Sequence, residues 1–304
     1  MTWKLKLVLG YTNLRKPLDV NKDGIDKMRR ESNKAAWLGS KLFDTPVPVK
    51  KSTDVSADGV PVRIYQNSTA PGQRVLIFYH GGGFALYHLE AHDNACRRLA
   101  AMNNCIVVSV DYRLAPEYTF PAAHEDAFAA IKWVLKNIAE YGGNANDLFV
   151  AGDSAGGNLS ACMAHRCKKE GIKLKGQILI YPWIDGKLSN PSIEKNGTGY
   201  LLLRDTMFWF QKQYTPNKED QCKPEVSPKY ESSFDGLAPA FVLTAQFDPL
   251  VDDGYNYYQQ LKGAGNNASY NEYPGLIHGF FNIPKVSPQA MKAYDDIALF
   301  MKAL

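Results

Sequence analysis

The sequence predicts an α/β fold in which a mostly parallel central sheet is covered by helices on both faces. Short, nearly continuous apolar runs recur along the chain, at 74–79, 105–110, 148–151, 177–181 and 240–245. Such runs are typical of strands buried on both faces, as in a parallel sheet between two helical layers. Segments with apolar residues at helical spacing lie between the runs, and strands that alternate with helices indicate a doubly wound layer structure.

The first 45 residues predict a helical segment separate from the sheet. Over 26–43, helical spacing places five apolar residues near one face: Met28, Ala35, Ala36, Leu38 and Leu42. The Thr-Pro-Val-Pro sequence at 45–48 then breaks the pattern and marks a boundary. A strand at 60–65 follows the turn signal Asp58-Gly59.

Helices are also predicted between and after the later strands. Apolar residues recur at helical spacing over 127–138, and Gly142-Gly143 ends that helix. A strand is expected at 269–273. Ser287-Pro288 is typical of an N-cap followed by proline at the first helical position, and predicts a last helix that runs to Leu304.

Residues 185–230 are too long for a simple crossover between two strands and contain the aromatic cluster Met-Phe-Trp-Phe at 207–210. We predict that this insertion packs with the N-terminal segment as a cap over the carboxyl edge of the sheet, where open α/β sheets bind ligands. The predicted parts are an N-terminal helical cap segment at 1–45, core at 46–184, a cap insertion at 185–230 and core again at 231–304.

The composition argues against membrane insertion and against a nucleic-acid partner. No run in the 304 residues approaches the roughly 18 apolar residues of a membrane span. The net charge is +4, but residues 1–51 hold 12 lysines and arginines against 5 acidic residues. We interpret this segment as a solvated, partly helical face, with an anionic partner or a membrane surface as the alternative. Aromatic residues are not interleaved with the basic ones, so no nucleic-acid partner is expected.

The sequence predicts a cytoplasmic location. Lysines interrupt the apolar residues at the N-terminus, and no secretory signal pattern follows. The five cysteines are odd in number, scattered and without metal-type spacing, which agrees with that location. The oligomeric state stays open, since a sheet edge or the last helix could serve a homodimer.

The strongest signal for chemistry is Gly-Asp-Ser-Ala-Gly at 152–156, between the strand run 148–151 and a helical run that starts at Ala155. In this context Gly-x-Ser-x-Gly is the nucleophile elbow. The tight turn requires minimal side chains around the serine and lifts the Ser154 hydroxyl clear of the sheet. The following helix directs its N-terminus at a developing oxyanion. Ser154 is therefore the candidate nucleophile.

A second signal is His-Gly-Gly-Gly-Phe at 80–84, directly after the strand run 74–79. Consecutive glycines let the backbone approach a ligand closely and turn its N–H groups inward. The segment suits an oxyanion hole completed by the N–H of Ala155. A phosphate-binding loop is the alternative, but neither the Lys-Ser/Thr ending of a P-loop nor G-x-G-x-x-G spacing is present.

The base should follow the nucleophile, because the expected chain order is serine, acid, histidine. Only His165 and His278 of the six histidines lie after Ser154. His165 stands eleven residues along the nucleophile's own helix, out of reach of the hydroxyl, which leaves His278. His80 comes too early in the chain and is interpreted as a structural hydrogen bonder.

The acid should lie at the end of a strand. Asp248 follows the run 240–245, and Pro249 fixes the turn after it. Asp248 would hold the imidazole in the correct tautomer and stabilise its charge. Asp252 is the alternative acid, although Asp252 and Asp253 could instead cap the helix that follows.

Together these segments resemble the hormone-sensitive-lipase-like family of bacterial esterases, which has the α/β-hydrolase fold. The resemblance rests on the motifs at 80–84, 111–117, 152–157, 227–228, 248–250 and 278–280, which stand in the family's order at similar spacing. It implies that Gly82, Gly83 and Ala155 supply the oxyanion N–H groups, and that 111–117 braces the active-site loops. It further implies an enzyme without cofactor or metal that often favours short acyl chains and carries a cap.

The sequence therefore favours a serine carboxylesterase that hydrolyses small, short-chain esters through an acyl-enzyme intermediate. Two alternatives remain. One is an amidase or deacetylase that uses the same triad, and the other is a non-catalytic small-molecule receptor on the same fold. Plant gibberellin receptors resemble this family but lack the base that this chain keeps as His278. A secreted lipase is not favoured, because no signal peptide is found.

Overall fold

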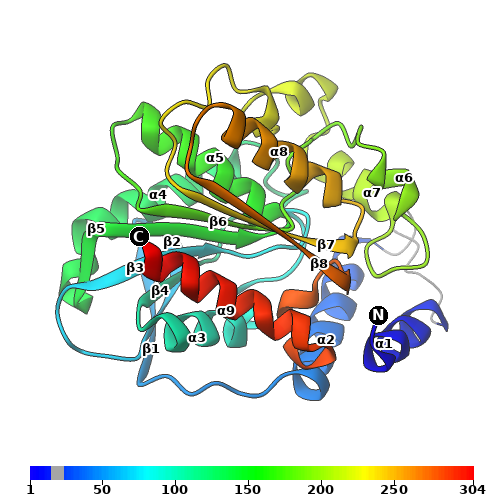
Figure 1. Ribbon diagram of the computed structural model, residues 1–304, viewed down its shortest axis with the longest axis horizontal. Coiled ribbons are helices and arrows are strands. Elements are labelled where there is room, and N and C mark those ends of the chain that lie inside the picture. The colour runs from blue at the N-terminus through cyan, green and yellow to red at the C-terminus, as the bar shows by residue number, and fades with distance from the viewer. Residues whose placement is uncertain (15–23) are drawn as a thin grey trace.

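In the computed structural model, which describes residues 1–14 and 24–304, eight strands form one sheet (Figure 1). Their order across the sheet is β1-β2-β4-β3-β5-β6-β7-β8. The bounds are β1 (Lys51–Ala57), β2 (Val60–Gln66), β3 (Gln73–Tyr79), β4 (Ile106–Val110), β5 (Gly143–Asp153), β6 (Gly176–Ile180), β7 (Ala240–Phe247) and β8 (Ala268–Ile277). Strand β2 pairs antiparallel with β1 and β4, and all pairs from β4 to β8 are parallel.

The strands that the sequence predicts are all present, whereas β1 is not predicted. Strand β1 lies at the edge of the sheet and is mostly exposed. An exposed edge strand has no need of an apolar run, so nothing in its sequence distinguishes it from a loop.

Helices cover both faces of the sheet, as Figure 1 shows. On one face lie α4 (Ala122–Asn137), α5 (Ala155–Lys169) and α8 (Val251–Gly263), and on the other lie α3 (Leu89–Asn103) and α9 (Pro288–Ala303). The predicted α/β architecture is therefore confirmed. The Ser287 hydroxyl accepts a hydrogen bond from the backbone N–H of Gln289, which is the N-cap predicted for α9.

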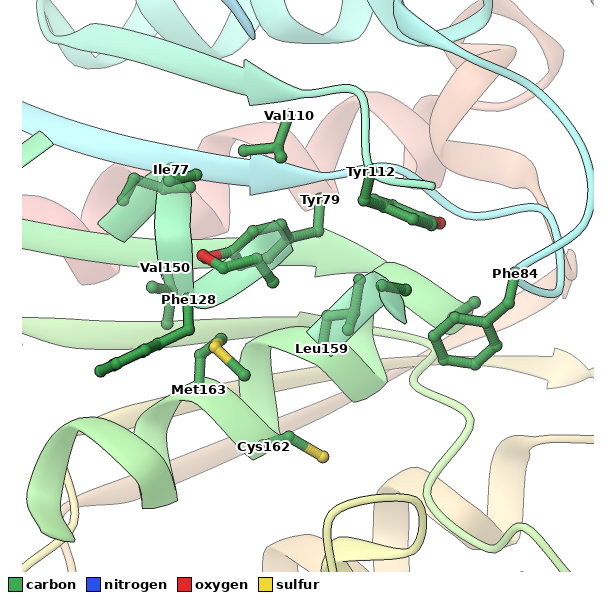
Figure 2. Packing of buried hydrophobic residues seen from close by; sticks show 14 of the residues in the cluster. Ile77, Tyr79, Phe84, Val110, Tyr112, Phe128, Val150, Leu159, Cys162 and Met163 are labelled. Carbon is green, nitrogen blue, oxygen red and sulfur yellow. The ribbon is translucent and has the colours of Figure 1, made fainter. Parts of the chain in front are cut away.

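The packing of the core explains why the sequences of the parallel strands are continuous apolar runs. Alternate side chains point to opposite faces of the sheet, and each helical layer buries one set. On the α4–α5 side, Ile77, Tyr79 and Val150 pack with Phe128 and Met163 (Figure 2). The intervening side chains pack against α3 and α9. Both sets are apolar because neither face of these strands contacts water.

The two segments predicted as a cap contain helices and 3-10 turns that are not part of the two layers covering the sheet. The N-terminal segment holds α1 (Trp3–Leu14) and α2 (Ile25–Phe43), and the insertion holds α6 (Ser192–Lys195), α7 (Arg204–Tyr214), η2 (Lys218–Cys222) and η3 (Pro228–Tyr230). Three further 3-10 turns are η1 (Ile138–Tyr141), η4 (Phe280–Asn282) and η5 (Pro284–Val286). Of the five apolar residues grouped on one face of 26–43, only Met28 is buried, and Leu42 is 60% exposed. Helix α2 lies on the outside and touches α3, η4 and η5 along one edge.

Two kinds of feature are missing from the described part of the chain. No helix within residues 1–14 or 24–304 is long and apolar enough to span a bilayer. Over the same residues, no three His, Cys, Asp or Glu side chains group as ligands for a metal ion. The five cysteines are all free thiols, four of them buried.

Candidate active site

The predicted nucleophile stands at a sharp turn between β5 and α5. The backbone of Ser154 has φ 56° and ψ −116°, a strained conformation for a residue with a side chain. Its N–H donates to the carbonyl of Ile180 on the neighbouring strand (2.9 Å). Backbone bonding across the sheet therefore holds the serine in a conformation that it would not adopt in an isolated turn.

The glycines of this turn are required by close packing. A Cβ on Gly156 would collide with the backbone carbonyl of Tyr79 at the end of β3, and a Cβ on Gly152 would meet the carbonyl of Gly156. The elbow thus presses directly on the backbone of the adjacent strand. Any side chain at these positions would separate Ser154 from the loop that follows β3.

That loop carries the predicted oxyanion residues and lies against the elbow. Gly81 donates its N–H to Oδ1 of Asp153 (2.8 Å). Gly83 has φ +61°, and a Cβ there would overlap the ring of Phe210 from α7. Ala155 begins α5, so its N–H has no acceptor within the helix. The structure therefore brings Ala155 and the glycine loop to the same edge of the sheet, with α7 packed over them.

The segment 111–117 supports this loop from behind. The Tyr112 hydroxyl donates to the carbonyl of His80 (2.6 Å), and the two rings stack with centroids 4.3 Å apart. The N–H of Ala115 donates to the carbonyl of Phe84 (2.8 Å). Burial lowers the pKa of His80 to about 3, so this imidazole is neutral. His80 contacts the carbonyl of Gly81 through Nδ1 (2.7 Å), as expected of a structural residue.

The predicted acid and base meet at the carboxyl ends of β7 and β8. Nδ1 of His278 lies 2.7 Å from Oδ2 of Asp248. The second oxygen of Asp248, Oδ1, accepts the N–H of Leu250 (2.8 Å). Asp248 is fully buried, whereas the His278 side chain is 12% exposed. This arrangement orients the imidazole and leaves Nε2 as the nitrogen available for proton transfer.

A tyrosine that the sequence analysis did not single out connects the base to the elbow. Tyr181 follows β6, which lies between β5 and β7 in the sheet. Its ring lies 4.5 Å from the His278 ring, centroid to centroid. Its hydroxyl lies 3.4 Å from Oδ2 of Asp153, the residue before the nucleophile. One buried side chain thus contacts both halves of the candidate site.

The expectation that Asp252 and Asp253 cap α8 is wrong. The N-cap of α8 is Leu250, and no side chain caps this helix. Asp253 instead accepts the backbone N–H groups of Ile184 and Asp185 at 2.7 and 2.8 Å, and Asp252 accepts the N–H of Ser192 at 2.8 Å. Both carboxylates point away from their own helix because the start of the insertion, close in space, offers unpaired donors.

His165, which the sequence excludes as the base, is buried on α5 with Nε2 3.0 Å from the Tyr257 hydroxyl. Burial lowers the pKa of His165 to about 4, compared with about 6.5 for an exposed imidazole. Between these pH values the unfolded chain binds a proton that the folded chain does not. Above about pH 6.5, His165 therefore does not reduce the free energy of unfolding. As the pH falls from about 6.5 toward 4, the buried neutral imidazole lowers that free energy progressively.

We expect His165→Gln to make the acid loss of stability less steep, by about 1.4 kcal/mol per pH unit between pH 4.5 and 6. Denaturant unfolding of both proteins across that range measures the difference. Tyr257→Phe is the matched control, because it removes the hydrogen bond and retains the imidazole. An acid slope in His165→Gln equal to that of the wild type contradicts the prediction.

Comparisons with known proteins identify relatives over most of the chain. A family model described as the alpha/beta hydrolase fold matches residues 76–282. The chain is similar to the carboxylesterase NlhH of Mycobacterium tuberculosis, with 40% identity over 239 residues, 77% of this chain and 75% of that protein. It is 33% identical to the ethyl acetate hydrolase of Pseudomonas putida over 293 residues, 94% of this chain and 92% of that one.

A solved structure agrees with these sequence relatives. The hyperthermophilic esterase from the archaeon Pyrobaculum calidifontis is 37% identical and superposes with a TM-score of 0.89. The superposition covers 92% of this chain and 93% of that one. The similarity in sequence and in fold therefore extends over nearly the full length of both proteins.

Proposed function

This chain belongs to the hormone-sensitive-lipase-like family of α/β-hydrolases and is a serine carboxylic-ester hydrolase, and on that premise we propose that it cleaves small, short-chain esters with Ser154, His278 and Asp248 as its triad. The observation that carries the triad is the 2.7 Å contact between Asp248 Oδ2 and His278 Nδ1. The two residues follow β7 and β8, and Ser154 follows β5 at the same edge of the sheet. A buried carboxylate on Nδ1 leaves Nε2 as the nitrogen that can accept the proton of the Ser154 hydroxyl.

In the proposed mechanism, the Ser154 oxygen attacks the ester carbonyl carbon while Nε2 of His278 accepts the hydroxyl proton. The carbonyl π electrons move to oxygen, and the N–H groups of Gly82, Gly83 and Ala155 stabilise the resulting oxyanion. Collapse of this intermediate breaks the bond to the alcohol, which leaves with the proton from His278. Water then repeats the sequence on the acyl-enzyme and releases the acid. No step uses a cofactor or a metal ion.

The preference for short acyl chains is supported by the enclosure of the site. Ser154 is only 7% exposed, and Phe210 fills the space next to Gly83. A long acyl chain would have to displace aromatic side chains of α7, of which Trp209 and Phe210 are buried. The division into an N-terminal cap segment, a core and a cap insertion remains a proposal, and the same contact between α7 and the glycine loop supports its cap insertion.

A series of 4-nitrophenyl esters with increasing acyl length tests this preference. We expect kcat/KM to be highest for acetyl to butanoyl esters and to fall at least about tenfold for the decanoyl ester. A pocket that fits a short acyl chain lowers kcat/KM for a much longer chain by about this factor or more. Ser154→Ala, measured with each ester, corrects for hydrolysis that does not involve the site. A preference for decanoyl over butanoyl would refute the short-chain proposal while leaving the ester hydrolase intact.

Neither alternative raised by the sequence is favoured by the relatives named carboxylesterase, ethyl acetate hydrolase and acetyl esterase. Matched 4-nitrophenyl acetate and 4-nitroacetanilide measure the amidase activity directly. We further propose a cytoplasmic enzyme, which is supported by five free cysteines. The absence of a nucleic-acid partner is a separate proposal, which rests on the sequence pattern of the basic residues. Homodimer formation is a proposal that light scattering tests.

A further inference from the structure

Beneath the glycine loop lies a buried polar cluster that the proposed mechanism does not use. Its centre is the carboxylate of Asp153, whose side chain is 5% exposed. Oδ1 accepts the N–H of Gly81 (2.8 Å) and lies 3.0 Å from Nε2 of His92, on α3. The Tyr181 hydroxyl lies 3.4 Å from Oδ2. A carboxylate is thus held between the elbow, the glycine loop and a helix of the opposite layer.

His92 also contacts the segment that carries the base. Nε2 of His92 also lies 3.1 Å from the side-chain amide of Asn282, the last residue of η4. Because Nε2–H donates to Asp153, this amide shares the proton by turning its oxygen toward the ring. Turn η4 begins at Phe280, two residues after His278. The His92 side chain is 2% exposed, so solvent does not replace either contact. The His92 imidazole therefore contacts Asp153, which precedes the nucleophile, and Asn282, which lies in the segment after the base.

The charge of Asp153 depends on this arrangement. Burial alone raises the pKa of Asp153, but interaction with His92 and the N–H of Gly81 lower it, so that the pKa lies below its ordinary value. A buried carboxylate that loses one donor is strongly destabilised unless it finds another. The donors that remain are the Tyr181 hydroxyl and the backbone N–H of Gly81 in the glycine loop. Loss of His92 would therefore displace the backbone that precedes Gly82 and Gly83.

We propose that His92 is a positioning residue for ester hydrolysis: through Asp153 it sets the place of the glycine loop, and through Asn282 it sets the place of the His278 loop. This inference rests on the proposed function, because the loop matters only if it stabilises an oxyanion. Oxyanion donors act through geometry, and a small misplacement weakens the transition state more than the ground state.

Two variants that differ by one methylene test the proposal. In His92→Gln the amide reaches the position of Nε2 and can donate to Asp153, whereas the shorter side chain of His92→Asn ends at the position of Nδ1. We expect His92→Asn to lower kcat about 10-fold to 100-fold, less than the loss of a whole oxyanion donor, with KM changed less than about threefold. His92→Gln should retain kcat within about threefold of the wild type.

The decisive readout is the affinity of a trifluoromethyl ketone. The oxygen of Ser154 adds to the carbonyl carbon of the ketone, and the ketone oxygen becomes an oxyanion in the oxyanion hole. We expect Ki to rise in His92→Asn by the same factor as kcat/KM falls, which a purely structural role would not produce. An unchanged Ki in folded His92→Asn overturns the proposal, as does a rise in Ki that is equally large in His92→Gln.

Wild-type protein and Ser154→Ala accompany every assay. A wild type that hydrolyses no ester refutes the proposed function, whereas an active wild type with an unaffected His92→Asn refutes only the role of His92. If circular dichroism shows that His92→Asn does not fold, Asn282→Ala removes the second contact of the same nitrogen. We expect Asn282→Ala to raise the Ki of the trifluoromethyl ketone at least about threefold. An unchanged Ki in this variant also overturns the proposal.

Discussion

Replacement of Ser154 by alanine is expected to lower kcat for 4-nitrophenyl acetate at least about 10⁴-fold. The variant has no oxygen to attack the ester carbonyl, so the acyl-enzyme cannot form. The loss corresponds to about 5.5 kcal/mol of transition-state stabilisation. Stopped-flow or steady-state release of 4-nitrophenolate measures it. The fold should be retained, because the backbone N–H of residue 154 still donates to the carbonyl of Ile180.

A matched control lies one turn and a half along the same helix. The Ser160 hydroxyl donates to the carbonyl of Gly156 (2.9 Å) and is fully buried. Ser160→Ala therefore removes a buried hydroxyl from α5 without removing the nucleophile, and kcat should change less than about threefold. If Ser154→Ala keeps more than about 1% of the wild-type kcat, residue 154 is not the nucleophile.

Replacement of Asp248 by asparagine is expected to lower kcat about 10³-fold to 10⁴-fold. The reason is the second hydrogen bond of the acid. Oδ1 of Asp248 accepts the N–H of Leu250, so the asparagine oxygen must occupy that position and its NH₂ group must face His278. Nδ1 of His278 is then forced to accept, and the ring proton moves to Nε2. An Nε2 that already carries a proton cannot take one from Ser154.

Asp252→Asn is the matched control, because Asp252 is the alternative acid that the sequence left open. Asp252 accepts the N–H of Ser192 at the start of α6 and has no contact with His278 among the hydrogen bonds of the described residues. We expect its kcat within about fivefold of the wild type. A larger loss in Asp252→Asn than in Asp248→Asn would reverse the assignment of the acid.

The sequence accounts for most of the layered fold and for the choice of the proposed triad residues. A strand buried on both faces must be apolar throughout, so the runs at 74–79 and 240–245 are recognisable one at a time. The elbow is equally local, because the glycines on either side of Ser154 are imposed by a turn only a few residues long. Chain order then excluded His80 as the base, and helix geometry excluded His165, which lies three turns along the nucleophile's own helix.

The sequence could not predict contacts whose partners lie far apart in the chain. The edge strand β1 has no apolar run, and Asp253 pairs with N–H groups 69 and 68 residues away instead of with its own helix. No local signal marks Tyr181 or His92 as neighbours of the site. A buried tyrosine or histidine is ordinary in a core, and its importance depends on what the neighbouring strands and helices place beside it.

The sequence by itself determined which side chains can do chemistry, because a nucleophile elbow, a glycine loop and an acid after a strand are each encoded within a few consecutive residues. Only the tertiary structure decided how these side chains meet. The order of β5, β6, β7 and β8 brings residues 154, 248 and 278 to one edge, and the buried Asp153–His92 pair joins the elbow to the opposite helical layer. Sheet order and burial depend on the whole chain, because the strands that pair with a given strand and the helices that cover it come from distant parts of the sequence.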